Sequence, residues 1–478
     1  MSSIKYLGFF LLSLLISSTT FAAEYTVPRA AYSVYSEDLD LDGDIDIVIG
    51  HNYNWQTQWS GVSILENNGI GEFTLIDSIF LYAGQPDIQI KNLNINELPE
   101  IIAKYYDSEE ENEYIAIINN FNFYDISYFS LNTYEGVENL TAGDIDNDND
   151  IDIIVASNGG QFWGVLYNDG TGQFSEPEYH NVTGYYPTDI ACGNLNEDDR
   201  NDVAICGQKT EVYFSYETGF DCIILEENDF KEDIEIADMD NDNDNDIIVL
   251  VNLGLVGYTG IKIYENTGNN CFSGHELILF QPPLSYFKTS DLNNDNLPDI
   301  VCSGTYGVYI LYNEGDLQLS EPQYFPTSTS GLSRPPFCAD LDGNGYNDII
   351  TIRALFFTGI LTILFNDGNG NFVEEPQIGV DEEFLLKPGI TLTNYPNPFN
   401  PVTCINFSLN KEGYTTLKIF NLKGQLVRKL IEEYKRAGDY SILWDSKNKD
   451  GKEVSSGLYL YRMQVENHCI TRSLTLVK

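Results

Sequence analysis

Most of the chain alternates short apolar runs with loops rich in Asp, Asn and Gly. A typical run, Asp152–Val155, is β-branched and too short to favour a helix. The run after it ends in the turn Asn168–Gly170, whose residues favour the positive φ that hairpin turns require. This turn recurs at Asn366–Gly368 and, in weaker form, near Asn67, Asn266 and Asn313. The pattern predicts short antiparallel strands joined by tight turns.

An acidic motif lies between the apolar runs and repeats along residues 24–380. Its copies begin at Asp38, Asn92, Asp144, Asn194, Asp238, Asp291 and Asp340. Seven units of about four strands each cannot bury their sheets singly, but can do so when the sheets stack radially. The sequence therefore predicts an all-β fold, a seven-bladed β-propeller, with a straight solenoid as the alternative. Only one strand is expected before Asp38, and the sequence does not show how the ring closes.

The first acidic loop places carboxylates at its first, third, fifth and ninth positions, with Gly43 at the sixth. These carboxylates belong to Asp38, Asp40, Asp42 and Asp46. Alternate spacing directs side chains toward one centre when the backbone coils, and calcium prefers six to eight such oxygen ligands. The loop is therefore a candidate calcium site. The alternative is an Asx turn that needs no ion. An EF-hand is excluded because its twelfth position needs Glu, and Ile49 stands there.

The loop resembles the calcium-binding loop of the FG-GAP (VCBS) repeat family, whose members form propellers like those of integrin α-chains. The resemblance implies structural calcium ligands at four further loops: Asp144, Asp146, Asp148 and Asp152; Asp238, Asp240, Asp242 and Asp246; Asp291, Asn293, Asp295 and Asp299; and Asp340, Asp342, Asn344 and Asp348. A weaker site is expected in the fourth loop at Asn194, Asn196, Asp198 and Asp202. The second loop has Asn92, Asn94, Asn96 and Glu100, and we expect it to be largely metal-free.

A second domain is expected at residues 392–478, after a linker at 381–391. Alternating strands are predicted at 404–409, 415–420, 426–431, 438–444, 457–465 and 469–477, which favours a small Ig-like β-sandwich. The segments YPNPFNP (395–401), KIFNLKGQLV (418–427) and DGKEVSSGLYLYRM (450–463) closely resemble the type A sorting domain of the type IX secretion system. The resemblance implies the type IX secretion machinery as a partner and export across both bacterial membranes. A plain Ig-like module is the alternative.

Charge divides the chain in the same way. The formal net charge is -48, yet residues 392–478 carry 13 Lys and Arg against 8 Asp and Glu. An acidic surface repels phosphate, so nucleic acid is excluded as a partner. Residues 1–23 have the short apolar run of a signal peptide, and no later stretch is long enough to be transmembrane. We expect a secreted or outer-surface protein.

The eight cysteines are compatible with disulfides after export. Cys192 and Cys206 flank one acidic loop, and Cys404 and Cys469 share the C-terminal domain, so each pair is a candidate disulfide. Buried free thiols are the alternative.

The sequence offers no catalytic motif: no GxSxG, HExxH or phosphate-binding Gly loop is present. The four His residues are scattered and are expected on the surface or in turns. We therefore expect a non-catalytic binding or adhesion module with an unidentified protein or glycan ligand. The aromatic stretch 53–59 is one candidate contact surface. The alternative is a secreted polysaccharide-active enzyme, such as a lyase, built on a propeller.

Overall fold

The computed structural model describes residues 23–27, 31–54, 59–81, 87–94, 98–107, 110–119, 126–133, 135–184, 186–196, 198–227, 230–254, 257–275, 277–281, 283–304, 307–327, 332–354, 359–373, 390–395, 399–409, 413–421, 426–436, 438–449, 451–465 and 468–477. The predicted signal peptide up to residue 22 and linker residues 381–389 lie outside this range. The regular secondary structure described is all β-strand, which confirms the predicted class. None of it is a helix long and apolar enough to cross a membrane. The chain divides into two compact units, Met1–Ile378 and Gly379–Lys478.

In its described residues the first unit contains seven antiparallel sheets, which we number in chain order. Sheet 1 is β2 (Ala31–Glu37), β3 (Asp46–Asn54), β4 (Trp59–Asn67) and β5 (Phe73–Leu81); sheet 2 is β6 (Ile88–Lys91), β7 (Glu100–Asp107), β8 (Asn112–Ile118) and β9 (Ile126–Ser130); sheet 3 is β10 (Val137–Gly143), β11 (Asp152–Ser157), β12 (Phe162–Leu166) and β13 (Glu178–Asn181); sheet 4 is β14 (Asp189–Gly193), β15 (Asp202–Cys206), β16 (Lys209–Tyr216) and β17 (Gly219–Glu227).

Sheets 5 to 7 follow the same order. Sheet 5 is β18 (Phe230–Ala237), β19 (Asp246–Asn252), β20 (Thr259–Asn266), β21 (Phe272–Gly274) and β22 (Ile278–Phe280); sheet 6 is β23 (Leu284–Ser290), β24 (Asp299–Gly304), β25 (Gly307–Leu311) and β26 (Gln323–Pro326); sheet 7 is β27 (Leu332–Ser333), β28 (Phe337–Ala339), β29 (Asp348–Ala354), β30 (Gly359–Asn366), β31 (Phe372–Val373) and β1 (Ala23–Val27). Each predicted repeat unit therefore corresponds to one sheet.

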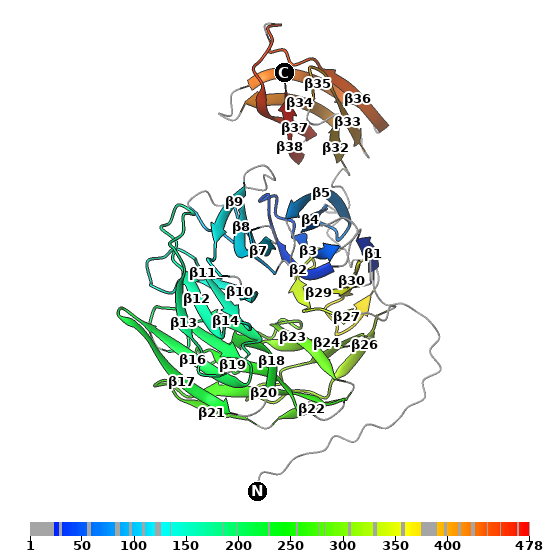
Figure 1. Cartoon of the computed structure of the whole chain (residues 1–478). Helices are drawn as coiled ribbons and strands as arrows, with labels where there is room; N and C mark the ends of the chain where they lie inside the picture. The colour runs from blue at the N-terminus through cyan, green and yellow to red at the C-terminus, as the bar shows by residue number, and fades with distance from the viewer. Residues whose placement is uncertain are drawn as a thin grey trace. The chain divides into compact units, whose positions relative to one another are not determined.

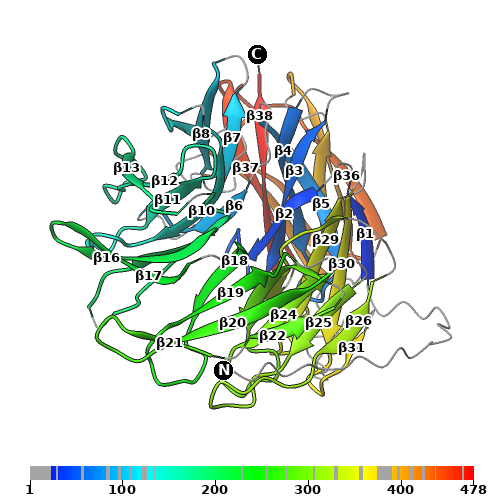
Figure 2. The same ribbon diagram turned by 60° about the horizontal axis from the view of Figure 1, so that its bottom comes forward.

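The sheets form a closed ring (Figures 1 and 2). Their innermost strands β2, β6, β10, β14, β18, β23 and β28 lie side by side in that order, and β28 also lies beside β2. A separate apolar cluster fills each space between neighbouring sheets, including the one between sheets 7 and 1. Second strands such as β11 are buried at every residue because neighbouring sheets cover both of their faces. The short β-branched runs of the sequence are these strands.

The N-terminal segment closes the ring in a way that the sequence did not show. Strand β1 pairs antiparallel with β30, with Ala23 opposite Ile363 and Val27 opposite Gly359. The prediction of a single strand before Asp38 was therefore wrong, because β1 belongs to sheet 7 and only β2 to sheet 1. Backbone hydrogen bonds thus connect the two ends of this unit.

The second unit is a two-sheet β-sandwich. One sheet contains β32 (Ile390–Tyr395), β33 (Thr403–Leu409) and β36 (Gly438–Trp444); the other contains β35 (Leu426–Lys435), β34 (Gly413–Asn421), β37 (Gly457–Val465) and β38 (His468–Leu476). Trp444 is fully buried in the core between them, and its indole N–H donates to the carbonyl of Lys447 at 3.0 Å. The alternating strands read from the sequence are all present.

The cysteines whose side chains the structure describes are free thiols, as in the alternative to disulfides. Cys192 and Cys206 are both free, and Cys404 is also free and bonds to Ser441 instead. The Cys192–Cys206 and Cys404–Cys469 pairings are therefore wrong for this structure. Cys206 is buried in β15, where a thiol packs like a small apolar side chain.

Candidate metal-binding loops

Each acidic loop connects the first and second strands of its sheet, and its ninth residue begins the second strand. The first carboxylate coils the loop around itself. In the first loop, Asp38 accepts hydrogen bonds from the backbone N–H of Asp42 at 3.1 Å and of Gly43 at 3.0 Å. Asp144, Asp238, Asp291 and Asp340 accept the same pair of bonds in their loops. The predicted coiling is therefore present in five loops.

The sharp turn uses positive φ at two positions. The sixth residue has φ of 92° at Gly43 and 71° at Asn149. The fourth residue does so as well, with φ of 58° at Leu41 and 59° at Asn147. Asn tolerates this region better than most residues, which explains its use where Gly is absent.

Four loops bring three carboxylate oxygens within 4.8 Å of one another. The groups are Asp38, Asp40 and Asp42; Asp144, Asp146 and Asp152; Asp238, Asp240 and Asp246; and Asp340, Asp342 and Asp348. Oxygens that each lie about 2.3–2.6 Å from one calcium ion are separated by no more than about twice that distance. Asp46, Asp148 and Asp242 are outside these groups, so the structure gathers most but not all of the predicted ligands of each loop.

Two of these loops contain a carboxylate oxygen that no protein group satisfies. Oδ1 of Asp146 and Oδ1 of Asp240 are buried and have no hydrogen-bond partner. Burial raises the pKa of both side chains, and the nearby carboxylates Asp148 and Asp242 raise them further. A buried, unpaired, negatively charged oxygen is costly unless a cation lies against it. The residues present therefore fit a hard divalent cation such as calcium.

The ninth residue has a second role. Asp46 accepts hydrogen bonds from the backbone N–H of Leu39 at 3.3 Å and of Asn67 at 2.9 Å, and so connects its loop to the end of β4. Burial is the main cause that raises the pKa of Asp46 and of Asp348 to about 8. A cation at the loop would favour the ionised form of these groups.

Three loops are arranged differently, because an amide N–H points at an oxygen of the same loop. Asn94 Nδ2 donates to Glu100 Oε1 at 2.5 Å, and Asn194 Nδ2 donates to the carbonyl of Asp198. In the sixth loop Asn293 Nδ2 donates to Asp295 Oδ2 at 3.0 Å. Such bonds hold a loop without an ion. The second, fourth and sixth loops therefore contain an internal amide contact that the other loops do not use, and whether they hold an ion stays a prediction; the predicted Asn96 lies outside the described residues.

An Asn at or just after the end of the third strand of several sheets also holds these loops. From the sequence it was predicted only as a turn residue. Asn67 Nδ2 donates to the carbonyl of Ile45 in its own loop at 3.0 Å and to that of Leu341 in the neighbouring loop at 2.8 Å. The same pair of bonds is made by Asn168, Asn266, Asn313 and Asn366. These five side chains connect the loops of sheets 1, 3, 5, 6 and 7 each to a loop of an earlier or adjoining sheet. Their recurrence before Gly was the signal that could have revealed them.

Sheet 4 departs from this rule and compensates for it. Ser215 occupies the position of the Asn, and its backbone N–H still donates to Asp202 at 2.8 Å. The carbonyl of Ile145 in the neighbouring loop instead accepts a long bond, 3.5 Å, from Arg200 Nη1. Arg200 thus supplies a donor, and a positive charge, beside the third loop.

The histidines whose side chains the structure describes, His51, His180 and His275, lie in or beside different sheets. The expectation that they lie on the surface or in turns is wrong for His51, which is fully buried on β3 with Nε2 at 2.7 Å from Ser63 Oγ. His275 instead contacts Glu265 at 2.6 Å, in a different sheet. The side chains of the aromatic stretch 53–59 lie outside the described residues.

Two family models match parts of the chain. The FG-GAP-like repeat model matches residues 144–205 and 291–351, and the FlgD Ig-like domain model matches residues 405–468. The chain therefore contains FG-GAP-like repeats and a C-terminal Ig-like domain. No curated protein matches the sequence. Among solved structures, an Agrocybe aegerita lectin, described as recognising non-reducing terminal N-acetylglucosamine, aligns with a TM-score of 0.48 and 18% identity over 71% of this chain and 92% of its own.

Proposed function

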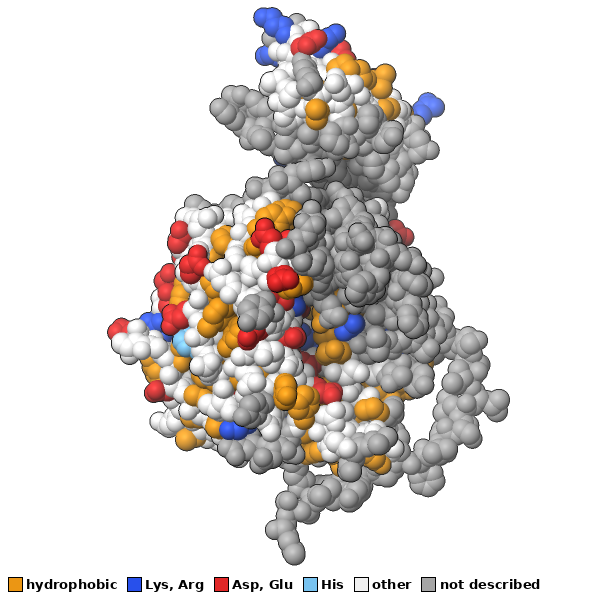
Figure 3. All heavy atoms as spheres, in the orientation of Figure 1, with side chains coloured by type: hydrophobic (Ala, Val, Ile, Leu, Met, Phe, Trp, Pro, Cys, Tyr) orange, Lys and Arg blue, Asp and Glu red, His pale blue; other side chains and the backbone are white. Residues whose placement is uncertain are grey.

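We propose that this chain is an exported, calcium-loaded, seven-bladed β-propeller that acts as a non-catalytic binding or adhesion module at the cell surface. Calcium has a structural role in this proposal. It neutralises the grouped carboxylates and holds each loop against its sheet. The acidic surface of the ring, where red side chains are widespread in Figure 3, makes cations its natural counterparts.

The observation that carries the proposal is the pair of buried, unpartnered oxygens on Asp146 and Asp240, each within a group of three carboxylates. Hydrogen bonding satisfies polar atoms elsewhere in these loops, so the unsatisfied oxygens mark where a ligand is missing from the protein's own contacts. In each of these loops the ion would be held by the first, third and ninth residues.

The test is thermal unfolding of the full chain in calcium and in excess chelator. An ion that binds only the folded state raises apparent stability by mass action. We expect a saturable rise in Tm with millimolar calcium, smaller in Asp146→Asn. Asp199→Asn is the matched control. It removes an exposed charge from the fourth loop, and Asp199 belongs to none of the groups of three carboxylates. An unchanged Tm at millimolar calcium would refute the calcium claim.

Export is a separate part of the proposal, supported by the sorting-domain signatures and the β-sandwich that carries them. The type IX machinery would recognise residues 392–478 and deliver the propeller to the outer surface or the medium. In a bacterium with this system, the full chain should reach the surface and a chain lacking 392–478 should stay in the periplasm. Equal export of both chains would refute this part.

The non-catalytic assignment is supported by the lack of any recognised catalytic motif in the sequence. It is tested by incubating the protein with a panel of polysaccharides. Turnover that disappears on mutating one pocket would replace the binding module with the polysaccharide-active enzyme.

A further inference from the structure

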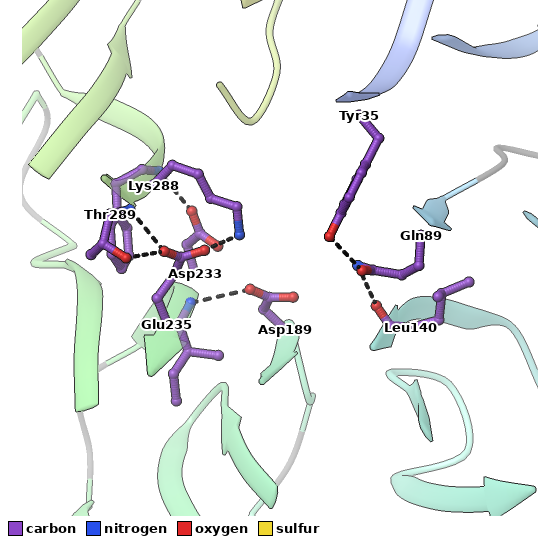
Figure 4. A network of polar contacts seen from close by, with 10 residues as sticks. Tyr35, Gln89, Leu140, Asp189, Asp233, Glu235, Lys288 and Thr289 are labelled. Carbon is purple, nitrogen blue, oxygen red and sulfur yellow. Dashed lines mark hydrogen bonds and ion pairs between the residues drawn. The ribbon is translucent and has the colours of Figure 1, made fainter. Parts of the chain in front are cut away.

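A polar cavity of about 710 Å³ lies at the centre of the ring, lined by all seven innermost strands or the residues beside them. Figure 4 shows part of its wall: Tyr35 and Gln89 stand on one side and Asp189, Glu235 and Lys288 on the other. Cavities of this size hold small organic ligands, and they far exceed the space that one metal ion needs. The cavity is separate from the acidic loops.

A repeated backbone irregularity adds side chains to this wall. The pairing of the first and second strands skips one residue in sheets 1, 3, 5 and 6, always at the same place in the strand. The skipped residues are Tyr32, Glu138, Glu232 and Ser285, and all four line the cavity. A β-bulge redirects side chains in this way, and bulges are frequent beside functional sites. Four bulges in register therefore mark the cavity as more than a gap left by packing.

The wall has an excess of negative charge. Its carboxylates are Asp87, Glu138, Asp189, Glu232, Asp233 and Glu235, against the cations Lys91, Lys288 and Arg334. Lys288 is already paired with Glu235. An anionic ligand is therefore disfavoured, and a ligand with a net positive charge would supply the missing countercharge.

Two adjacent carboxyl groups, those of Asp189 and Asp233, lie in the wall. Asp189 accepts a hydrogen bond from the backbone N–H of Ile234 at 3.1 Å, and Asp233 accepts one from Phe287 at 2.7 Å. The two side chains also share a hydrogen bond, and burial followed by the charge of Asp233 raises the pKa of Asp189 well above its usual value. Two carboxyl groups held this close are suited to a ligand ammonium group.

Arg334, in contrast, calls for a negatively charged group on the ligand. Its guanidinium stacks over the ring of Tyr32, 4.3 Å from the centroid, and its buried Nε has no hydrogen-bond partner. A buried guanidinium N–H without an acceptor is costly, and a carboxylate is its best partner. Tyr286 interacts with Arg334 and also with Asp233 and Asp189, so the two requirements belong to one cavity.

We propose that the central cavity binds a small basic amino acid of the lysine type, with its side-chain ammonium group at Asp189 and Asp233 and its α-carboxylate at Arg334. The ligand has a net positive charge, as the wall requires, and a carboxylate that can accept from the unpartnered Nε–H of Arg334. The site goes beyond the proposed role of the acidic loops and does not depend on calcium in them.

The test uses three matched probes against the full chain by isothermal titration calorimetry, with saturating calcium in every sample. Lysine has both charged ends, cadaverine lacks the carboxylate, and norleucine lacks the side-chain ammonium group. We expect one lysine site per chain, with cadaverine and norleucine each bound about tenfold or more weakly, since a charge-assisted hydrogen bond contributes about that factor.

Variants then assign the two ends. Arg334→Gln should weaken lysine about tenfold and leave cadaverine unchanged, while Asp189→Asn should weaken lysine and cadaverine and leave norleucine unchanged. Lys288→Gln should tighten cadaverine because it removes a competing positive charge. This third variant decides the matter if Asp189→Asn does not fold.

Three results would overturn the proposal. No saturable lysine binding at millimolar concentration would exclude the site. Equal binding of lysine and cadaverine, unaffected by any of the three variants, would indicate counter-ion association with the acidic surface. Norleucine binding as tightly as lysine would remove the role of the carboxyl pair. Failure of calcium to raise Tm would leave all of these readings intact, because that result concerns the loops alone.

Discussion

Asn67→Ala should destabilise the ring strongly, because this side chain connects the first sheet to the last. Asn67 is 4% exposed and belongs to β4, yet its amide reaches the carbonyl of Leu341, in the acidic loop between β28 and β29 of sheet 7. Alanine removes the donor to the carbonyl of Leu341 in a buried contact and the donor to the carbonyl of Ile45 in a half-buried contact. Oδ1 of Asn67 also accepts the backbone N–H of Gly69, which would lose its partner.

The magnitude follows from these losses. A buried carbonyl left without a donor costs about 1–3 kcal/mol, and the half-buried bond to Ile45 adds about 1 kcal/mol, so the loss of stability is about 2–4 kcal/mol. Asn68→Ala is the matched control: the same substitution one residue later, at an exposed side chain whose amide donates to Glu72 at 2.8 Å. It should cost about 1 kcal/mol or less. Urea unfolding of the full chain in calcium measures both variants. A cost for Asn67→Ala no larger than that of Asn68→Ala would refute the inter-sheet role.

Three further predictions concern single residues. Asp240→Asn should lower Tm in calcium, because it weakens a ligand, but not in chelator, where it relieves repulsion between carboxylates; a loss of Tm in both media would contradict the metal site. Burial raises the pKa of Glu113 from 4.5 to about 7, so its ionisation costs stability as pH rises through that window. Glu113→Gln should remove about 3 kcal/mol of the loss in unfolding free energy between pH 4 and pH 8, measured by urea unfolding; an unchanged slope would show that another group is responsible. Arg200→Gln should lower Tm, and adding Ser215→Asn should restore it, because the Asn supplies the inter-sheet amide that sheet 4 lacks; the absence of rescue would show that Arg200 acts through its charge alone.

The sequence predicted those features that depend on local chemistry. The ninth residue of every acidic loop begins a strand, because the carboxylate that starts each apolar run also accepts the backbone N–H groups at the strand ends. The strands of the C-terminal sandwich were also predictable, because their apolar residues alternate with polar ones and turns with Gly or Pro separate the strands.

Features that depend on distant partners were not predictable. Strand β1 is only five residues long and pairs with residues far along the chain, and nothing in its composition identifies β30 as the partner. Asn67 looks like an ordinary turn residue, and its partner Leu341 is 274 residues away. His51 was expected on the surface because of its residue type, whereas β3 carries it into the interior, where its Nε2 lies 2.7 Å from Ser63 Oγ.

The central cavity was not predictable from the sequence for a similar reason. Asp87, Asp189 and Asp233 each lie five residues before an acidic loop, but only the closed ring brings them around one space. An alignment of the seven copies of the repeat would have shown that the position five residues before the acidic loop is polar in several copies. It would not have shown that Arg334 lies in the same cavity.

The number of calcium ions bound per chain tests the central claim most directly. Equilibrium dialysis of the full chain against millimolar calcium, with metal analysis of the retained protein, gives this number. We expect about four ions, one at each loop with three grouped carboxylates, and the loss of one ion in Asp240→Asn. A chain that retains no calcium above the buffer level, or the same amount in Asp240→Asn, would contradict that claim.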